Sequence, residues 1–330
     1  MDTGSATTEH GLIRQHGERP RRSGGAARRA VAAAALLGVC ALGISGCTID
    51  KGKLTGSDSS SATATQDSLP KPTPGSEPTT GDAVAVPGDG ALPAALIHAV
   101  ADIEAQYGGQ VGIALANPSV GGGSADPATA GALQVGPAWS TSKVPIAVAV
   151  ARNSGVTQDM TAAITASDNA AAEVMWASLG DPASAGAAAT QVLRDGGDSV
   201  TNVETTKVRP EFSSFGQTQW ALENQAAFGA NLQCIPGGQQ VADLMGQIVG
   251  GQAYGLGTIT GAHFKGGWGP DETGSYLTRQ FGFIPGDKPG SFVGVAIAAK
   301  PADGTYDTGQ AMLTALAAVL ADGTGRGGTC

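Results

Sequence analysis

Hydrophobic residues follow two different spacings in the first part of the folded chain. Over 92–107 an apolar residue recurs every three or four positions, which predicts a helix ending at a glycine pair. Alternation over 111–115 predicts a strand, and Leu133 with Val135 predict a second one. The glycines at 121–123 predict a turn between the two strands.

Helical spacing dominates the middle of the chain. Asp181 followed by Pro182 predicts the start of a helix, because Asp caps free backbone N–H groups and Pro fits the first turn. Two more helices are predicted over 220–232 and 241–248.

Strand patterns return toward the C-terminus, over 262–267, 276–284 and 292–299, and a final helix is predicted over 307–321. Short connections between these strands imply antiparallel pairing. The fold class is therefore α/β, with a five-stranded antiparallel sheet flanked by the N- and C-terminal helices, plus an all-helical lobe. Ligand sites commonly lie between such lobes.

Residues 1–46 have the pattern of a bacterial export signal. Arginines precede an apolar segment at 30–44, about fifteen residues long, which suits a secretory signal and is too short to span a membrane. Residues 44–47 resemble a lipobox. The resemblance implies cleavage before Cys47, a lipid on its thiol, and a lipoprotein held on the outer face of the cell membrane. An ordinary signal peptide with an incidental Cys is the alternative.

Residues 47–90 are rich in Ser, Thr, Pro and Gly and contain few large apolar side chains. Such a composition cannot bury a core, so we expect a disordered tether. Residues 91–330 then form a single folded domain.

The charge of the exported chain is strongly acidic. Of 19 basic and 28 acidic residues, the signal segment holds six and three, which leaves a net charge of −12. This balance argues against nucleic-acid binding and against electrostatic adhesion to anionic lipid.

Cysteine usage agrees with export. Cys40 leaves with the signal and Cys47 carries the lipid, so Cys234 and Cys330 remain. An even pair in an oxidising compartment predicts a disulfide, which would stabilise the fold by about 4 kcal/mol. Two free thiols are the alternative.

Ser140 and Lys143 form an S-x-x-K motif just before the apolar run 144–151. Three residues apart, a hydroxyl and an amine fall on one face of a helix. The first turn of a helix also has unclaimed backbone N–H groups, which are donors for a developing oxyanion. Taken alone, the motif is more typical of a capped surface helix than of a catalytic site.

Two further motifs follow in order. S-D-N occupies 167–169 within the helical region, and K-G-G occupies 265–267 on the first returning strand. The three motifs in this order resemble the penicillin-recognising serine hydrolases, and the sequence around S-D-N resembles class A β-lactamases in particular. The resemblance covers about residues 92–322 and implies a β-lactamase/transpeptidase-like fold.

The resemblance implies a role for each motif residue. Ser140 would attack a lactam or peptide carbonyl, and Lys143 would take its proton. Ser167 would relay that proton to the leaving nitrogen, Asn169 would hold the substrate amide, and Lys265 would face the substrate carboxylate.

The returning strands would complete the site. The backbone N–H groups of Ser140 and Trp268 would form an oxyanion hole. Gly266 and Gly267 would lie along the substrate, and Arg279 would add a carboxylate contact. The alternatives are ordinary structural ones, namely helix caps, a solvated lysine, a bulge and a surface arginine.

The chain also departs from the family pattern. Only 23 residues separate Lys143 from Ser167, so part of the cleft wall is missing. An ungapped count places Lys207 where the resemblance implies a water-activating Glu, and Phe215 stands where an Asn is implied. Glu211 is the nearest candidate base, although a structural or surface role is the simpler interpretation. Slow deacylation follows.

Other chemistries fit less well. The exported chain has only His98 and His263, with no partner arrangement for a Ser-His-Asp triad. No Cys/His cluster suggests zinc, so we expect no metal and no cofactor.

Three functions are therefore in competition. The first is a lipid-anchored serine hydrolase acylated at Ser140 by D-Ala-D-Ala-like peptides or β-lactams, with slow deacylation. The second is a catalytically inactive envelope lipoprotein that binds cell-wall fragments or another protein. The third is a true β-lactamase. We expect a monomer whose partner is a cell-wall peptide or a β-lactam-like small molecule.

Overall fold

The computed structural model describes residues 91–120 and 125–330. Within these residues the helices are α1 (Ala94–Tyr107), α2 (Lys143–Ser154), α3 (Gln158–Thr165), α4 (Asn169–Ser178), α5 (Pro182–Asp195), α6 (Leu222–Asn231), α7 (Gly238–Met245) and α8 (Tyr306–Ala321). The strands are β1 (Gly109–Ala116), β2 (Ala128–Ala130), β3 (Val135–Pro137), β4 (Gln219–Ala221), β5 (His263–Pro270), β6 (Tyr276–Pro285) and β7 (Phe292–Pro301).

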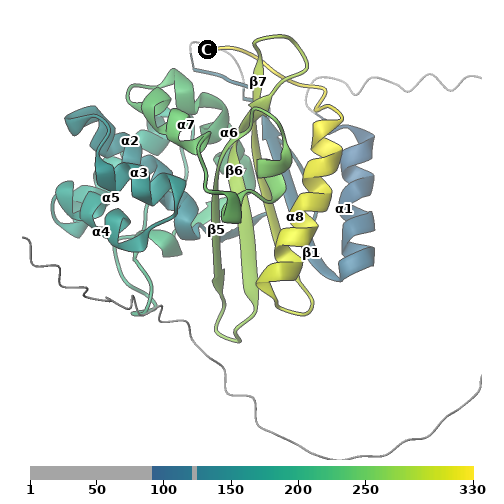
Figure 1. Cartoon of the computed structure of the whole chain (residues 1–330), viewed down its shortest axis with the longest axis horizontal. Helices are drawn as coiled ribbons and strands as arrows, with labels where there is room; N and C mark the ends of the chain where they lie inside the picture. The colour runs from purple at the N-terminus through teal and green to yellow at the C-terminus, as the bar shows by residue number, and fades with distance from the viewer. Residues whose placement is uncertain (1–90, 121–124) are drawn as a thin grey trace, which may run out of the picture. The chain divides into compact units, whose positions relative to one another are not determined.

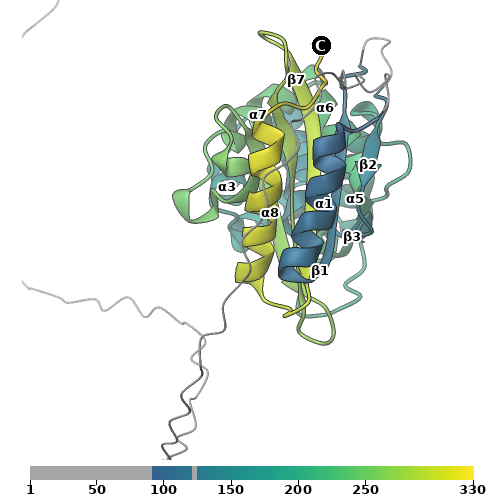
Figure 2. The ribbon, with the colours of Figure 1, turned by 90° about the vertical axis from the view of Figure 1, so that its right-hand side faces the viewer.

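Five strands form one antiparallel sheet in the order β2-β1-β7-β6-β5. Helices α1 and α8 lie side by side over one face of this sheet (Figure 2). Helix α6 packs against β1, β6 and β7, and the remaining helices gather beside it in a separate lobe (Figure 1). The predicted architecture is therefore confirmed, and β5 is an edge strand that faces the helical lobe.

The sheet separates two apolar cores, and β1 shows how the sequence supplies both. Val111, Ile113 and Leu115 pack toward α1 and α8, whereas Ala114 and Ala116 belong to the core shared with the helical lobe. Both faces of β1 are buried, so the alternation is one of large and small side chains rather than of buried and exposed ones. Each large side chain buried here contributes about 1.5–3 kcal/mol.

The boundaries of α5 follow the predicted local chemistry. The Asp181 carboxylate accepts a hydrogen bond from the Ser184 N–H at 2.7 Å, and Pro182 occupies the first turn. The helix ends at Asp195, and Gly196 is its C-cap. Its buried face includes Ala185, Val192 and Leu193, which pack into the helical lobe.

The second predicted strand lies elsewhere than expected. Val135 belongs to β3, which pairs with β4 in a separate two-stranded sheet, and the main sheet instead uses β2. Strand β2 has only three residues, too few to show a pattern in the sequence. Trp220, predicted to be helical, lies in β4 just before α6.

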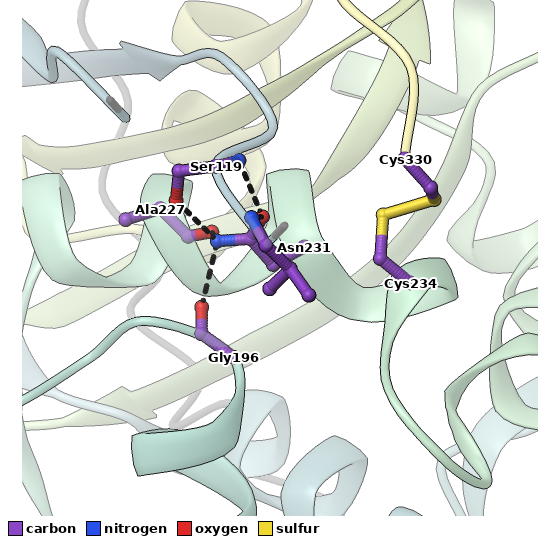
Figure 3. Close-up of a disulfide and its surroundings, with 7 residues drawn as sticks. Ser119, Gly196, Ala227, Asn231, Cys234 and Cys330 are labelled. Atoms are coloured by element: carbon purple, nitrogen blue, oxygen red, sulfur yellow. Dashed lines mark hydrogen bonds between the residues drawn. A yellow bond between two sulfur atoms is a disulfide. The ribbon is translucent and has the colours of Figure 1, made fainter. Parts of the chain in front are cut away.

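The disulfide between Cys234 and Cys330 is formed, with 5.3 Å between the two Cα atoms (Figure 3). It ties the C-terminal residue to the turn after α6. At the end of α6, the Asn231 amide donates to the carbonyls of Gly196 and Ala227. The same side chain accepts from the Ser119 N–H at 2.7 Å, so this corner joins loops distant in sequence.

Several predictions lie outside the described residues. These are the signal segment 1–46, the lipid attachment at Cys47, the tether 47–90 and the turn at 121–123. In the part of the chain that the structure describes, no helix has the length and apolar character needed to cross a membrane.

Candidate active site

Ser140 lies in a short 3-10 turn, η1 (Trp139–Ser142), that leads directly into α2. The two neighbouring hydroxyls, Thr141 Oγ1 and Ser142 Oγ, donate back to backbone carbonyls at 2.5 and 2.7 Å. Both of these side chains are buried, whereas Ser140 lines a cavity. The turn thus presents one hydroxyl to solvent and uses the other two to hold its own shape.

The S-D-N motif forms the turn between α3 and α4. The Asp168 carboxylate accepts from the Ala171 N–H at 2.8 Å and caps α4. Ser167 has a left-handed backbone with φ 59°, a conformation that costs a non-glycine residue about 1–2 kcal/mol. This turn directs polar atoms of Ser167 and Asn169 toward the same lysine.

That lysine is Lys143, whose side chain is almost entirely buried. Its Nζ donates to the Ser167 carbonyl at 2.7 Å, to Asn169 Oδ1 at 2.8 Å and to the Asp168 carbonyl at 3.2 Å. It also lies 3.4 Å from Ser167 Oγ. Burial lowers the pKa of Lys143 to about 8, against an opposing influence from the carboxylates of Asp168 and Glu173.

Lys265 reaches the same hydroxyl from strand β5. Its Nζ donates to Ser167 Oγ at 2.8 Å and to the Gly266 carbonyl at 2.8 Å. The side chain is fully buried, and burial together with the charge of Lys143 lowers its pKa well below the usual lysine value. Two desolvated amines sharing one hydroxyl disfavour each other's charge, so a neutral amine becomes accessible near physiological pH.

Strand β5 runs close against the Ser140 turn at Gly267. A Cβ at this position would lie 2.9 Å from the backbone N of Ser140 and 2.8 Å from the Ala138 carbonyl O. Only glycine therefore fits this gap. The next residue, Trp268, lines the cavity and stacks on Tyr306 with ring centroids 5.1 Å apart.

The cavity has a volume of about 270 Å³ and brings the motifs together. Ser140, Lys143 and Asn169 line it directly, as does Trp268. Ser167 and Lys265 join it through their hydrogen bonds to each other and to Lys143. The space accommodates several water molecules or part of a small ligand.

Solved structures show which known proteins share this arrangement of elements. The class A β-lactamase from Mycobacterium abscessus is 19% identical, with a TM-score of 0.51, and the match covers 68% of this chain and 97% of that one. The chromosome-encoded β-lactamase of Vibrio parahaemolyticus is 14% identical, with a TM-score of 0.53, over 69% of this chain and 98% of that one. This chain has the class A β-lactamase fold. An ancestral class A β-lactamase matches in the same way, at 21% identity and a TM-score of 0.50, over 69% and 99% of the two chains.

Similarity in sequence is much weaker than similarity in fold. No protein-family model matches the chain, and no curated protein matches it. The similarity therefore extends to the β-lactamase fold, and the chemistry of this chain depends on the side chains that line its own cavity.

Arg279 corrects one predicted site assignment. Its guanidinium is buried and donates to the carbonyls of Gly136 on β3 and Trp220 on β4, at 2.8 and 3.1 Å. It also donates to Gln225 Oε1 on α6. With these donors committed, Arg279 is a structural residue and offers no contact to a substrate carboxylate. The sequence could not reveal this, because it depends on which face of β6 the side chain occupies.

Glu211 does line the cavity, but its carboxylate is already paired. Arg209 Nε and a terminal guanidinium nitrogen lie 3.1 and 3.0 Å from Glu211 Oε1. Hydrogen bonds to this carboxylate, from the backbone first and from Arg209 next, lower its pKa. The side chain is 55% exposed. The pairing with Arg209 favours the predicted surface role over that of a base.

Further residues line the cavity, and the motifs had not singled out all of them. Glu173 lines it from α4, and Phe212 lines it from the loop after α5. Glu173 follows Asn169 by four residues, so helical spacing alone places the two side chains on one face. Lys207, at the position expected for a Glu, lines the same cavity.

Within residues 91–120 and 125–330, no group of three or more His, Cys, Asp or Glu side chains is placed to hold a metal ion.

Proposed function

We propose that the domain is a serine acyltransferase or hydrolase that forms an acyl-enzyme on Ser140 with D-Ala-D-Ala-like peptides or β-lactams. One observation carries this proposal: Ser167 Oγ lies within hydrogen-bonding distance of the amines of both Lys143 and Lys265, at the cavity that Ser140 lines. A buried, partly neutral amine beside a serine is a recognised way to activate the hydroxyl.

The chemistry follows from these positions. Lys143 in its neutral form takes the proton from Ser140 Oγ as the oxygen bonds to the substrate carbonyl carbon. The Ser140 and Trp268 N–H groups stabilise the negative charge on the former carbonyl oxygen. The Ser167 hydroxyl passes the proton on to the leaving nitrogen, and the C–N bond breaks. The product is an ester on Ser140.

Hydrolysis of that ester is expected to be slow. Lys207 replaces the expected carboxylate, and Glu211 is paired with Arg209. We therefore propose stable acylation rather than rapid β-lactam turnover.

Labelling with a fluorescent penicillin tests the proposal directly. We expect covalent labelling of the purified domain, lost in Ser140→Ala and retained in Ser213→Ala, which alters another serine lining the same cavity. A chromogenic cephalosporin measured in parallel should change colour slowly. The absence of labelling together with retained binding of cell-wall muropeptides would support the inactive binding module instead. Rapid colour change would support a true β-lactamase.

We also propose that the protein is a lipoprotein on the outer face of the cell membrane, anchored through Cys47. The lipobox-like sequence supports this location. Incorporation of a labelled fatty acid by the full chain, lost in Cys47→Ala, is the expected result.

A further inference from the structure

Two carboxylates line the Ser140 cavity, Glu173 on α4 and Glu211 on the loop before β4. We infer that Glu173 is the base that activates water against the Ser140 ester and sets the lifetime of the acyl-enzyme. This inference rests on the proposed acylation of Ser140 and adds the residue that reverses it.

The position of Glu173 follows from its helix. It lies one turn after Asn169 on α4, and both side chains line the cavity. Asn169 Oδ1 in turn accepts from Lys143 Nζ at 2.8 Å. A carboxylate on a capped helix is held more rigidly than one on a loop, and precise placement matters for proton transfer.

The charge of Glu173 already acts on the site. Its carboxylate raises the pKa of Lys143, opposing the larger effect of burial. Among the described residues, no ion pair involves Glu173. Its oxygens are therefore available to a water molecule in the cavity.

Glu211 is held in a different state. Arg209, which pairs with it, also donates to the Pro270 carbonyl at 2.6 Å and lies over the Phe212 ring at 4.4 Å. An anchored guanidinium stabilises the charged carboxylate and so weakens Glu211 as a proton acceptor. Lys207 also lines the cavity, but an exposed ammonium has no free electron pair to accept a proton.

The hydrolytic step balances with water as the only co-reactant. The Glu173 carboxylate takes a proton from water while the water oxygen bonds to the ester carbonyl carbon. Glu173 passes this proton to the neutral amine of Lys143, which delivers it to Ser140 Oγ as the bond between the carbon and Oγ breaks. The other proton of the water leaves with the carboxylic acid product, and Glu173, Lys143 and Ser140 return to their starting states.

The test separates acylation from hydrolysis. The domain and its Glu173→Gln and Glu211→Gln variants are labelled with the fluorescent penicillin, freed of excess label, and followed by intact-protein mass spectrometry. At a pH above the titration of Lys143, we expect Glu173→Gln to label at a rate within about threefold of the unaltered domain and to keep its label at least about tenfold longer, since general-base catalysis contributes two or more orders of magnitude. Glu211→Gln should lose its label at the unaltered rate.

Each outcome bears on a different claim. Normal labelling with an unchanged acyl-enzyme half-life in Glu173→Gln would overturn the assignment of Glu173 and leave the proposed function standing. A longer half-life in Glu211→Gln alone would transfer the role to Glu211. If the unaltered domain is not labelled on Ser140, the proposed function fails and the role of Glu173 fails with it.

Discussion

Ser167 adopts a backbone conformation that is unfavourable for its side chain and places its hydroxyl within reach of two buried amines. The cap made by its neighbour Asp168 holds the turn in that conformation. Local strain of this kind persists where surrounding contacts over-determine the backbone, and it concentrates at functional sites. The side chain of Asp168, the middle residue of the S-D-N motif, thus caps a helix, while the side chains of Ser167 and Asn169 lie within reach of Lys143 Nζ.

The acylation rate should rise with pH through the titration of Lys143. Only the neutral amine can accept the Ser140 proton, and burial lowers the pKa of Lys143 to about 8. We expect the rate of penicillin labelling to increase from about pH 6 and level off above a midpoint near 8, far below the ordinary lysine value of about 10.4.

A matched variant checks the origin of that midpoint. Glu173 raises the pKa of Lys143, so Glu173→Gln should move the midpoint to lower pH. A labelling rate that is flat across this range, or a midpoint above about pH 10, would show that Lys143 is not the base.

At the scale of elements, Arg279 connects strand β6 to the two-stranded sheet of β3 and β4, and β3 directly precedes the Ser140 turn. It donates from β6 to the carbonyls of Gly136 and Pro137 on β3 and of Trp220 on β4. Strand β3 ends two residues before η1 begins. The orientation of the Ser140 turn therefore depends on a buried side chain outside the cavity.

Replacing Arg279 should destabilise the fold. Arg279→Met leaves several buried carbonyl oxygens without a donor, which we expect to lower the free energy of unfolding by about 3 kcal/mol or more. Urea denaturation measures this difference. Lys300→Met, which removes an exposed ion pair with Asp271, serves as the control and should change little. Equal stability of Arg279→Met and the unaltered domain would contradict this structural role.

The length of an element decides whether its hydrophobic spacing can be recognised in this sequence. Long helices and strands with clear spacing, such as α8 and β7, were predicted to within a few residues. The short strands β2 and β4 were missed because three residues cannot display a period. The S-x-x-K, S-D-N and K-G-G motifs predicted that Lys143, Ser167 and Lys265 lie together, because short motifs of this kind can be recognised from sequence alone. Arg279 was misjudged because its role depends on which face of β6 the side chain occupies. Glu173 was not singled out, although its spacing of four residues from Asn169 on a helix was a signal that it lies on the same face.

At the scale of the whole molecule, the disulfide joins the end of the chain to the helical lobe. The Cys234–Cys330 bond closes a loop with a sequence separation of 96 residues. A loop of this length, when cross-linked, restricts the unfolded chain enough to stabilise the native state by about 4 kcal/mol.

Loss of this bond should lower thermal stability without removing the active site. We expect Cys330→Ser, or reduction of the unaltered domain, to lower Tm by about 10 °C while penicillin labelling at room temperature persists. Differential scanning calorimetry with and without reductant measures the shift. An unchanged Tm, or two reactive thiols in the unreduced protein, would show that the bond does not contribute as described.

Gly267 sets the distance between strand β5 and the turn that carries Ser140. The edge strand and the serine-bearing turn approach so closely there that a single methyl group would push them apart. Evolution of a new binding preference is therefore not expected through exchange of this glycine. The side chains at the rim of the cavity, such as Trp268 and those of the loop before β4, are the positions where exchange would alter what the cavity admits.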